Sequence, residues 1–558
     1  MIKSASDAAG GDAANDLAPV ETLAKGAKFG APIEDFGPVW DSALLQFSRA
    51  KWQHTGLEAF LNFDVPHTAT SNGRLSEDAV DIVLSAIAGR DTPTGGYRFL
   101  ELGSGSGLFA KLFLDRLQDE APDVYASSTY FATDGADSIL DSQKTFGVLD
   151  AHRDRVINLN LNAEQPWPAE LTGKVDFAFA TYLLDSLSFD ILAVKDAKRW
   201  RLETRTVYTG KNPDDLARLK AAANGQTPFD QTAMPDIASH LVLQTRYVDI
   251  EDSDLSLSDS LPTDTGGESR PTLHSYGALA CINNCLAALR AGGGMIVSDY
   301  GHAAPLDPSE EVEFQFYGGT IAHGLNFYQI DQYFSQKEDV QFFAPQEDGL
   351  SVHTRMIATP ECPDLSDEID LTYGKIRDTA FNLPIESARE ILRARLFEKA
   401  RKLYGKALEF QPRNWALLEE VSAFLLIPNE EFTSALTLVE QGLTINPFAP
   451  GLWRTKAEAL VGLDQLKEAV PAFERAIELN PKDAQTHLSY AQLRRKLDDR
   501  AGALQSIAHA FACDTSGDLR DDLLAEQDRV LLRINEIARD QLMHEVNRFR
   551  HLDDLPER

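Results

Sequence analysis

The pattern of hydrophobic and polar positions changes once along the chain, near residue 385. Before that point, short apolar runs typical of buried strands alternate with segments whose apolar residues follow helical spacing. These runs lie at 98–102, 130–134, 156–161, 175–181 and 295–298. Beyond residue 385 only the helical pattern remains. The sequence therefore predicts an α/β domain with a mostly parallel sheet, followed by an all-α domain.

A glycine-rich turn follows the first predicted strand. Glu101 ends the strand, and Gly103, Gly105 and Gly107 alternate with serines before a helix that begins at Leu108. Glycine allows positive φ and close approach of a ligand to the backbone. In an open α/β sheet, ligands bind outside the carboxyl ends of the strands, where this turn lies. The E-x-G-x-G-x-G spacing differs from the dinucleotide fingerprint G-x-G-x-x-G, so a purely structural turn is the alternative.

An acidic residue also ends the second predicted strand. Asp134 follows the glycine turn by about 30 residues, as in sites where a carboxylate accepts hydrogen bonds from ribose hydroxyls. The pairing of Asp134 with the turn favours a nucleoside-containing cofactor over a structural turn.

Four segments, in this order, resemble the MidA-like family of S-adenosylmethionine (SAM)-dependent methyltransferases: ELGSGSG, YFATDGADSILDSQ, FAFATYLLDSL and LRAGGGMIVSDYG. The resemblance covers about residues 95–360. It implies a Rossmann-like methyltransferase fold with SAM as cofactor. The family's mitochondrial member is a protein arginine methyltransferase that acts in respiratory complex I assembly. Departures from the family pattern are Tyr182 in place of an acidic residue, Ser188 in place of a proline, and the lack of a recognisable N-terminal GDF signature.

The resemblance assigns roles to individual residues. It implies that Glu101 faces the methionine end of SAM and that Asn162, with the small Ala163 beside it, reads the adenine edge. For Asn162 and Ala163, a plain turn is the alternative. The expected cofactor-binding residues are Glu101, Gly103, Ser104, Gly105, Gly107, Asp134, Gln143, Asn162, Ala163 and Thr181.

Methyl transfer to an amine or guanidinium requires nearby carboxylates that orient the acceptor and take up a proton. Asp185 and Asp299, at the ends of neighbouring predicted strands, are the first catalytic candidates. Tyr182, Tyr300 and His323 come next. Each of these residues has a structural role as its alternative. The sequence contains no convincing metal-ligand spacing and no G-x-S-x-G elbow after a strand, so neither a metal centre nor a hydrolase is expected.

The helical region repeats itself. Pro412, Pro447, Pro481 and Thr515 recur at spacings close to the 34 residues of a tetratricopeptide repeat. Small and large residues recur in register before each of them, which predicts closely packed helix pairs. These residues are Ala400, Tyr404 and Ala407; Ala435, Val439 and Gly442; Ala469, Phe473 and Ala476; and Ala503, Ile507 and Ala510. Such arrays commonly hold a peptide or helix of another protein, with dimerisation or stiffening of the enzyme as the alternative.

The predicted organisation has five parts. A disordered tail (1–35) precedes a helical cover (36–94) and the SAM methyltransferase domain (95–365). Within that domain, residues 195–270 form a long polar insertion, expected to be partly a substrate-facing lid and partly a mobile loop, with one strand at 240–250. Tetratricopeptide repeats (380–517) and a C-terminal capping helix (518–558) follow. The cap's apolar face is expected at Leu523, Leu524, Val530, Leu531, Ile534 and Ile537.

Amino-acid composition restricts the classes of binding partner and the cellular compartment that we expect for the protein. The formal net charge of −33 argues against a sequence-independent grip on nucleic acid or an anionic membrane. Four cysteines, too few and scattered for a disulfide framework, favour a reducing, cytoplasmic compartment. No apolar run is long enough to span a bilayer, and the first residues lack the pattern of a secretory signal.

Three functions remain open at this point. The first is a SAM-dependent methyltransferase that acts on a protein or peptide side chain recruited by the repeats. The second is a non-catalytic, methyltransferase-like scaffold or assembly factor. The third is a small-molecule methyltransferase.

Overall fold

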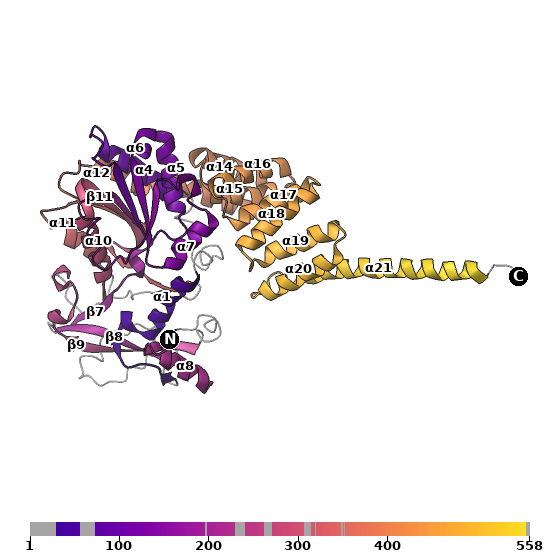
Figure 1. The fold of residues 1–558 in the computed structure, drawn as a ribbon, viewed down its shortest axis with the longest axis horizontal. Coiled ribbons are helices and arrows are strands. Elements are labelled where there is room, and N and C mark those ends of the chain that lie inside the picture. The colour runs from indigo at the N-terminus through magenta and orange to yellow at the C-terminus, as the bar shows by residue number, and fades with distance from the viewer. Residues whose placement is uncertain are drawn as a thin grey trace. The chain divides into compact units, whose positions relative to one another are not determined.

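The computed structural model describes residues 30–55, 73–195, 198–228, 240–261, 271–305, 314–317, 320–346, 350 and 352–553. Most of the expected tail, residues 1–29, lies outside the described residues. The chain forms two compact units, Met1–Leu383 and Pro384–Arg558 (Figure 1).

The first unit contains an eight-stranded sheet. Five strands are parallel: β3 (Tyr97–Leu102), β4 (Ser128–Asp134), β5 (Val156–Asn160), β6 (Val175–Thr181) and β11 (Leu289–His302). Strand β16 (Val352–Ala358) runs antiparallel between β11 and β15 (Gln341–Phe343). The order is β15-β16-β11-β6-β3-β4-β5, and short β14 (Leu325–Asn326) pairs with β11. This mostly parallel sheet confirms the predicted fold class.

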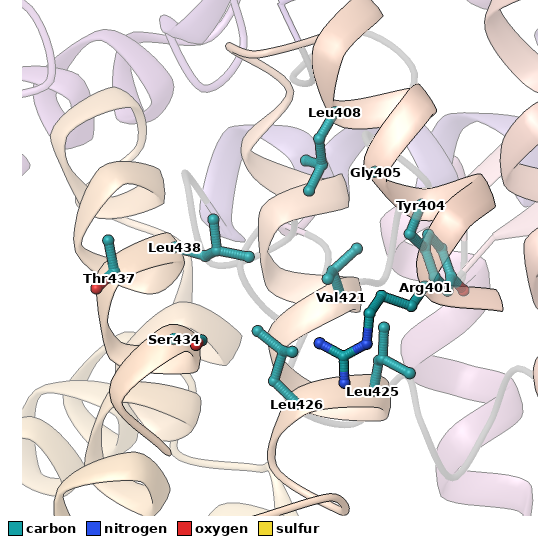
Figure 2. A pocket seen from close by; sticks show the side chains of 10 residues that line it. All are labelled: Arg401, Tyr404, Gly405, Leu408, Val421, Leu425, Leu426, Ser434, Thr437 and Leu438. Atoms are coloured by element: carbon teal, nitrogen blue, oxygen red, sulfur yellow. The ribbon is translucent and has the colours of Figure 1, made fainter. Parts of the chain in front are cut away.

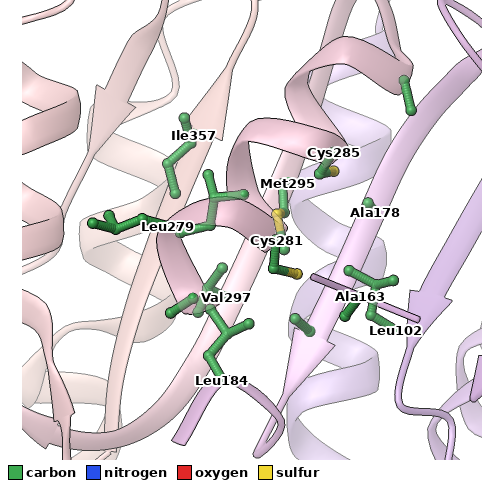
Figure 3. Close-up of a cluster of buried hydrophobic side chains, with 14 of the residues drawn as sticks. Leu102, Ala163, Ala178, Leu184, Leu279, Cys281, Cys285, Met295, Val297 and Ile357 are labelled. Carbon is green, nitrogen blue, oxygen red and sulfur yellow. The ribbon is translucent and has the colours of Figure 1, made fainter. Parts of the chain in front are cut away.

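Helices cover both faces of this sheet. On one face, α5 (Leu108–Glu120) places the ring of Phe113 5.2 Å from that of Phe99 and 5.0 Å from that of Phe179, and α4 (Arg74–Ile87) packs on α5. On the other face, α10 (Tyr276–Ala288) buries Cys281 and Cys285 against β6 and β11 (Figure 3), and α11 (Phe327–Ser335) joins the same core. Burial on both faces explains why these strands read as continuous apolar runs.

Strand β11 begins before the predicted 295–298. Its glycine run lies inside the strand, where the register with β6 shifts between Leu289 and Gly294. The remaining short elements of this unit are α6 (Pro122–Ala126), α7 (Asp137–Phe146), η5 (Asp150–His152), η6 (Leu184–Ser186), the hairpin β12 (Phe314–Tyr317) and β13 (Thr320–His323), and α12 (Ser366–Tyr373). Helix α13 (Lys375–Arg393) leads into the second unit.

The described part of the insertion expected at 195–270 contributes to a sheet that the sequence did not predict. Strand β8 (Lys198–Tyr208) is the centre of a second, antiparallel sheet that includes β7 (Asp190–Lys195), β9 (Leu241–Ile250), β10 (Thr272–His274), β1 (Ala31–Pro32) and β2 (Gly37–Pro38). Buried Trp200, Leu202 and Thr204 alternate along β8 with half-exposed charged residues. An alternation with a period of two is typical of a half-buried strand. In the sequence this alternation was hard to recognise because so many of the residues are charged. Strand β9 agrees with the strand expected at 240–250.

The described part of residues 36–94, which was expected to form one helical cover, is divided between two different sheets. Helix α1 (Ala43–Thr55), preceded by η4 (Val39–Asp41), packs Ala43 and Leu45 into the cores beneath the second sheet. Helix α4 packs against the first sheet's α5 instead. The insertion adds α8 (Pro213–Ala223), η9 (Asp252–Asp254) and η10 (Ser258–Ser260). Residues 56–72, 196–197, 229–239 and 262–270 lie outside the described part.

The second unit consists of antiparallel helix pairs. They are α14 (Phe397–Phe410) with α15 (Trp415–Val421) and its continuation, the π-helix η11 (Ser422–Leu426); α16 (Phe432–Ile445) with α17 (Pro450–Gly462); α18 (Leu466–Leu479) with α19 (Ala484–Lys496); and α20 (Arg500–Cys513) with α21 (Arg520–Asp553). All twelve positions predicted to recur in register are buried, which agrees with closely packed helix pairs.

Only part of the predicted apolar face of the last helix is covered. Leu523 and Val530 are buried in the last repeat's core, and Ile534 packs against it. Leu524 and Leu531 are exposed, contrary to prediction. The residues of α21 that pack on the array are Leu523, Val530 and Ile534, a narrower apolar face than the sequence predicted. None of the described helices combines the length and apolar character needed to cross a membrane.

The second sheet supplies a stability test. Leu202 is fully buried, so Leu202→Ala should reduce the free energy of unfolding by roughly 2–5 kcal/mol through lost burial and the cavity left behind. Val248→Ala, at a half-exposed position of β9, should have a smaller effect. Urea unfolding followed by circular dichroism measures both variants. Equal midpoints would contradict the buried face assigned to β8.

Candidate active site

The predicted site residues lie at the carboxyl edge of the first sheet. The glycine turn follows β3, Asp134 ends β4, Asn162 follows β5, Thr181 ends β6, and Asp299 lies in the carboxyl half of β11. Because these strands are parallel neighbours, their carboxyl ends meet on one side of the sheet. The sheet therefore brings together residues that are up to about 200 positions apart in sequence.

The turn after β3 depends on left-handed backbone geometry. Gly103, Gly105 and Gly107 have φ angles of 63°, 48° and 76°. A Cβ atom at Gly103 would lie 2.9 Å from the Leu183 side chain. Glycine is thus required here both by conformation and by the close approach of the loop after β6. Gly107 is also the residue that precedes the first turn of α5.

Gln143, on α7, holds the turn in place. Its Nε2 donates to Ser104 Oγ at 2.9 Å and to the Gly105 carbonyl at 2.8 Å. Its Oε1 accepts from Asn158 Nδ2 of β5 at 3.0 Å. The buried side chain thus uses both ends of its amide on the protein. These hydrogen bonds make Gln143 a positioning residue for the turn. The sequence had predicted that Gln143 contacts the cofactor.

Asp134 connects the second strand to the turn. Its carboxylate accepts from the backbone N–H of Gly105 at 3.2 Å and of Ala136 at 3.0 Å. The side chain is half-buried, and burial raises its pKa while the backbone N–H groups oppose that rise. A carboxylate offers about four acceptor positions, so two backbone bonds leave capacity for a ligand at this edge.

Glu101 lies beneath the turn rather than on its surface. Only 5% of the residue is exposed, and its Oε2 accepts from the Tyr130 hydroxyl at 3.1 Å. Burial raises the pKa of Glu101 to about 8, with a further increase from nearby Asp134 and an opposing effect of the Tyr130 hydrogen bond. Glu101 is therefore largely protonated at neutral pH, ready to ionise when a cation approaches.

The residues after β5 form the next part of the edge. Asn162 is exposed, and its Oδ1 caps the turn by accepting from the Glu164 N–H at 3.0 Å. Ala163 is buried, and its carbonyl accepts from Trp167 and Asn284. Asn162 thus has an exposed polar side chain at the carboxyl edge of the sheet, whereas Ala163 contributes its small size and its backbone.

Ser188 is one of the two single-residue departures from the family pattern. Glu164 accepts from its backbone N–H at 3.1 Å and from its hydroxyl. A proline at this position would have no N–H to donate. The pair of Glu164 and Ser188 is therefore a specific feature of this chain.

Tyr182, the other departure, has an unusual backbone. Its φ of 51° puts a bulky residue in the left-handed region, which costs about 1–3 kcal/mol and is concentrated at functional sites. Its N–H donates to the Ser298 carbonyl at 3.0 Å, and its ring stacks on that of Tyr300 with 4.8 Å between centroids. Both rings are half-buried, next to half-buried Thr181. The strained residue therefore places an aromatic pair at the end of β6.

The two catalytic candidates Asp185 and Asp299 form a pair. The Asp185 N–H donates to Asp299 Oδ2 at 3.1 Å, and the Tyr300 N–H donates to Asp299 Oδ1 at 2.8 Å. Asp299 is fully buried, and its burial together with the Asp185 charge raises its pKa strongly. Asp299 thus anchors the loop after β6, which favours its structural alternative. Burial raises the pKa of Asp185 to about 7, so Asp185 exchanges a proton near neutral pH.

His323, on β13, lies apart from the glycine turn. Its ring is buried 4.0 Å from that of Phe189, and its Nε2 lies 3.2 Å from the Leu187 carbonyl. Burial lowers its pKa to about 4, so it is neutral at physiological pH. His323 therefore supports the loop that carries Asp185.

Sequence reasoning missed four residues that hold the site. Three of them form hydrogen bonds: Tyr130 with Glu101, Asn158 with Gln143, and Glu164 with Ser188. The fourth, Leu183, lies close to Gly103. Two of them carried a signal, because Tyr130 and Asn158 are polar side chains inside apolar strand runs. A buried polar group needs a hydrogen-bonding partner, so such positions point to a network.

The residues at this edge fit a nucleoside-containing, cationic cofactor. The turn permits close backbone approach, Asp134 offers an acceptor for hydroxyls, and Glu101 can supply a compensating negative charge. These features define an α/β domain of the SAM-binding class.

Comparisons with known proteins support this class. Residues 82–331 match the model of a family described as "Putative S-adenosyl-L-methionine-dependent methyltransferase", and residues 450–493 match that of the tetratricopeptide repeat. The chain therefore carries a SAM-dependent methyltransferase domain, with SAM as its cofactor, followed by tetratricopeptide repeats. The match does not distinguish the MidA-like branch.

Two solved structures are similar to parts of the chain. One, described as a "likely methyl transferase" from Burkholderia thailandensis bound to S-adenosyl-homocysteine, is 12% identical with a TM-score of 0.36, over 60% of this chain and 96% of that one. The other, a tetratricopeptide-repeat protein from Thermus thermophilus, is 19% identical with a TM-score of 0.25, over 28% of this chain and 83% of that one.

The carboxyl pair predicts a pH dependence of stability. Asp185 has a higher pKa in the folded protein than in the unfolded chain, so the folded state loses stability as pH rises from about 4 to about 7. Asp185→Asn should therefore reduce the fall in melting temperature between pH 5 and 7.5, as measured by differential scanning calorimetry. Asp154→Asn, at an exposed carboxyl, should leave the fall unchanged. A wild-type profile retained in Asp185→Asn would refute the assigned burial effect.

Proposed function

We propose that the protein transfers a methyl group from SAM to a nitrogen-bearing side chain of a protein or peptide, with arginine as the first candidate, and that the repeats recruit this target. The observation that carries the proposal is the placement of Asp185, with a pKa of about 7, at the same sheet edge as the glycine turn and Asp134.

Each side chain at the edge has a part in this proposal. When bound, SAM supplies an electrophilic methyl group. The turn Gly103–Gly107, Asp134 and Asn162 would hold the cofactor, and Glu101 would balance the charge of its methionine end. Gln143 keeps the turn in the geometry that binding requires.

The acceptor side of the site would be formed by the loop after β6. Asp185 takes the proton that a nitrogen acceptor must lose, because its pKa lies near neutral pH. The stacked rings of Tyr182 and Tyr300 form an apolar wall that orients the acceptor and excludes water. Asp299 positions Asp185 through the backbone and does not itself accept the proton.

The tetratricopeptide repeats support a protein target over a small molecule. Arrays of this kind present extended surfaces that bind peptides and helices. A homodimer formed through the array is the alternative use of this surface. The four free cysteines fit the prediction of a reducing, cytoplasmic compartment.

A non-catalytic scaffold remains the second candidate function. It is favoured by Tyr182, which stands where the family pattern has an acidic residue, and by Asp299, whose carboxylate is occupied by backbone N–H groups. In that case the domain would bind SAM without transferring its methyl group, and the function would be the binding of a partner protein by the repeats.

Methylation of protein by the purified chain separates these functions. With labelled SAM and a proteome extract as acceptor, mass spectrometry should find label on protein side chains. Asp185→Asn should reduce this transfer by about 10²–10⁴-fold, the usual contribution of a general base. Calorimetry should show that the variant still binds SAM. SAM binding without any labelled protein would support the scaffold or a small acceptor.

The proposed charge balance at Glu101 can be measured separately. Because its pKa is about 8, the affinity for SAM should increase as pH rises from 6.5 to 8.5. Glu101→Gln, which keeps an oxygen acceptor for Tyr130, should weaken binding and flatten this dependence. Titration calorimetry at several pH values gives both affinities. An unchanged pH profile in the variant would rule out Glu101 as the titrating group.

A further inference from the structure

An apolar cavity opens in the first repeat of the C-terminal unit, between α14, the α15–η11 helix and α16 (Figure 2). Its volume is about 360 Å³, within the range of ligand pockets. Helix α14 lines it with Tyr404, Gly405 and Leu408, and the second helix with Val421, Leu425 and Leu426. Helix α16 adds Leu438 and the two hydroxyl-bearing residues Ser434 and Thr437. We call this cavity the apolar socket.

The repeat register explains why the socket is apolar here. Gly405 lies five residues after Ala400, and the equivalent positions in the next repeats hold Glu440, Glu474 and Ala508. Glu440 forms an ion pair with Lys456 at 3.2 Å, and Glu474 accepts from the Tyr490 hydroxyl at 3.1 Å. Each glutamate thus bridges to the second helix of its own repeat.

In the first repeat neither half of this bridge exists. Gly405 has no side chain, and Val421 occupies the position of Lys456 and Tyr490. The corresponding space between α18, α19 and α20 is lined by polar residues that include Arg494. The first repeat therefore offers a mostly apolar recess where the second and third repeats present polar or ionic groups.

The packing of the chain does not account for Gly405. A glycine inside a helix costs about 1 kcal/mol relative to alanine. A Cβ atom built at Gly405 would meet no atom within 4 Å, so no neighbour excludes a side chain. What Gly405 does is leave the mouth of the socket open. The adjacent π-helical turn, a feature frequent at functional sites, places Leu425 and Leu426 together in the wall.

The charge around the socket indicates its partner. Helix α14 carries four basic and two acidic residues, in a chain whose net charge is −33. Lys402 and Lys406 flank Gly405 on the exposed side of this helix, and Arg401 lines the socket in an ion pair with Glu431. An acidic segment is attracted to this rim, whereas most of the remaining surface repels it.

We propose that the apolar socket takes one large apolar side chain, such as Leu, Ile, Met or Phe, from an acidic segment of a partner protein. The inference rests on the proposed role of the repeats in recruiting a target, and it deepens that role by specifying the chemistry that is recognised. The side chain fills the recess left by Gly405 and Val421, and flanking Asp or Glu residues meet Lys402 and Lys406.

Selection from a random 15-residue peptide library on the full chain tests this proposal. Enriched peptides should share one large apolar residue flanked by Asp or Glu. The most enriched peptide, labelled with fluorescein, should lose at least tenfold in affinity when that apolar residue is changed to Ser. It should lose a similar factor on Gly405→Leu, which fills the socket, and bind more weakly at high salt.

Ala508→Leu is the matched control, because it adds the same side chain at the equivalent helix position of the last repeat. It should leave the affinity unchanged, and circular dichroism should show both variants folded. Failure to enrich such peptides, or equal affinity for wild type and Gly405→Leu, would overturn the proposal. A dimer that Gly405→Leu dissociates would assign the socket to a second copy of the chain and also overturn it. Peptide binding needs no methyl transfer, so its result is independent of the methylation assay.

Discussion

The hydrogen bonds from Gln143 to the turn after β3 are the interaction on which the candidate SAM site depends most. Three glycines with positive φ make this turn flexible, and ordering such residues is costly in conformational entropy. The Gln143 amide offsets that cost by bonding to Ser104 and Gly105, while Asn158 fixes the amide from the neighbouring strand. Asp134 adds a further hydrogen bond to the turn, which its carboxylate accepts from the Gly105 N–H.

The sequence predicted the parts of this design that follow from local pattern. Parallel strands that are buried on both faces appear in the sequence as apolar runs, so β4 and β6 could be predicted. The polar residues at the ends of these runs were then the candidate site residues. The second sheet was missed because the alternation along β8 is carried by arginine and threonine as much as by apolar residues. The roles of Gln143 and Asp299 could not be predicted, because their partners come from other elements and only the fold brings them together.

Each unit contains one departure from a regular pattern for which we propose a binding role. In the first, Tyr182 departs from the family pattern and from ordinary backbone geometry, and it places an aromatic ring beside Tyr300. In the second, Gly405 departs from the glutamate of the following two repeats and opens an apolar recess. Each departure has a local energetic cost, and at Gly405 no neighbouring atom excludes a side chain. A binding role accounts for that cost in both cases.

The central claim is that the turn held by Gln143 forms the SAM site. Titration calorimetry of SAM into the full wild-type chain and into Gln143→Leu tests it most directly, because leucine has a similar size but cannot hydrogen-bond to the turn. We expect saturable binding of one SAM per chain to the wild type and at least tenfold weaker binding to the variant. No binding to the wild type, or equal affinity for the two proteins, would contradict it.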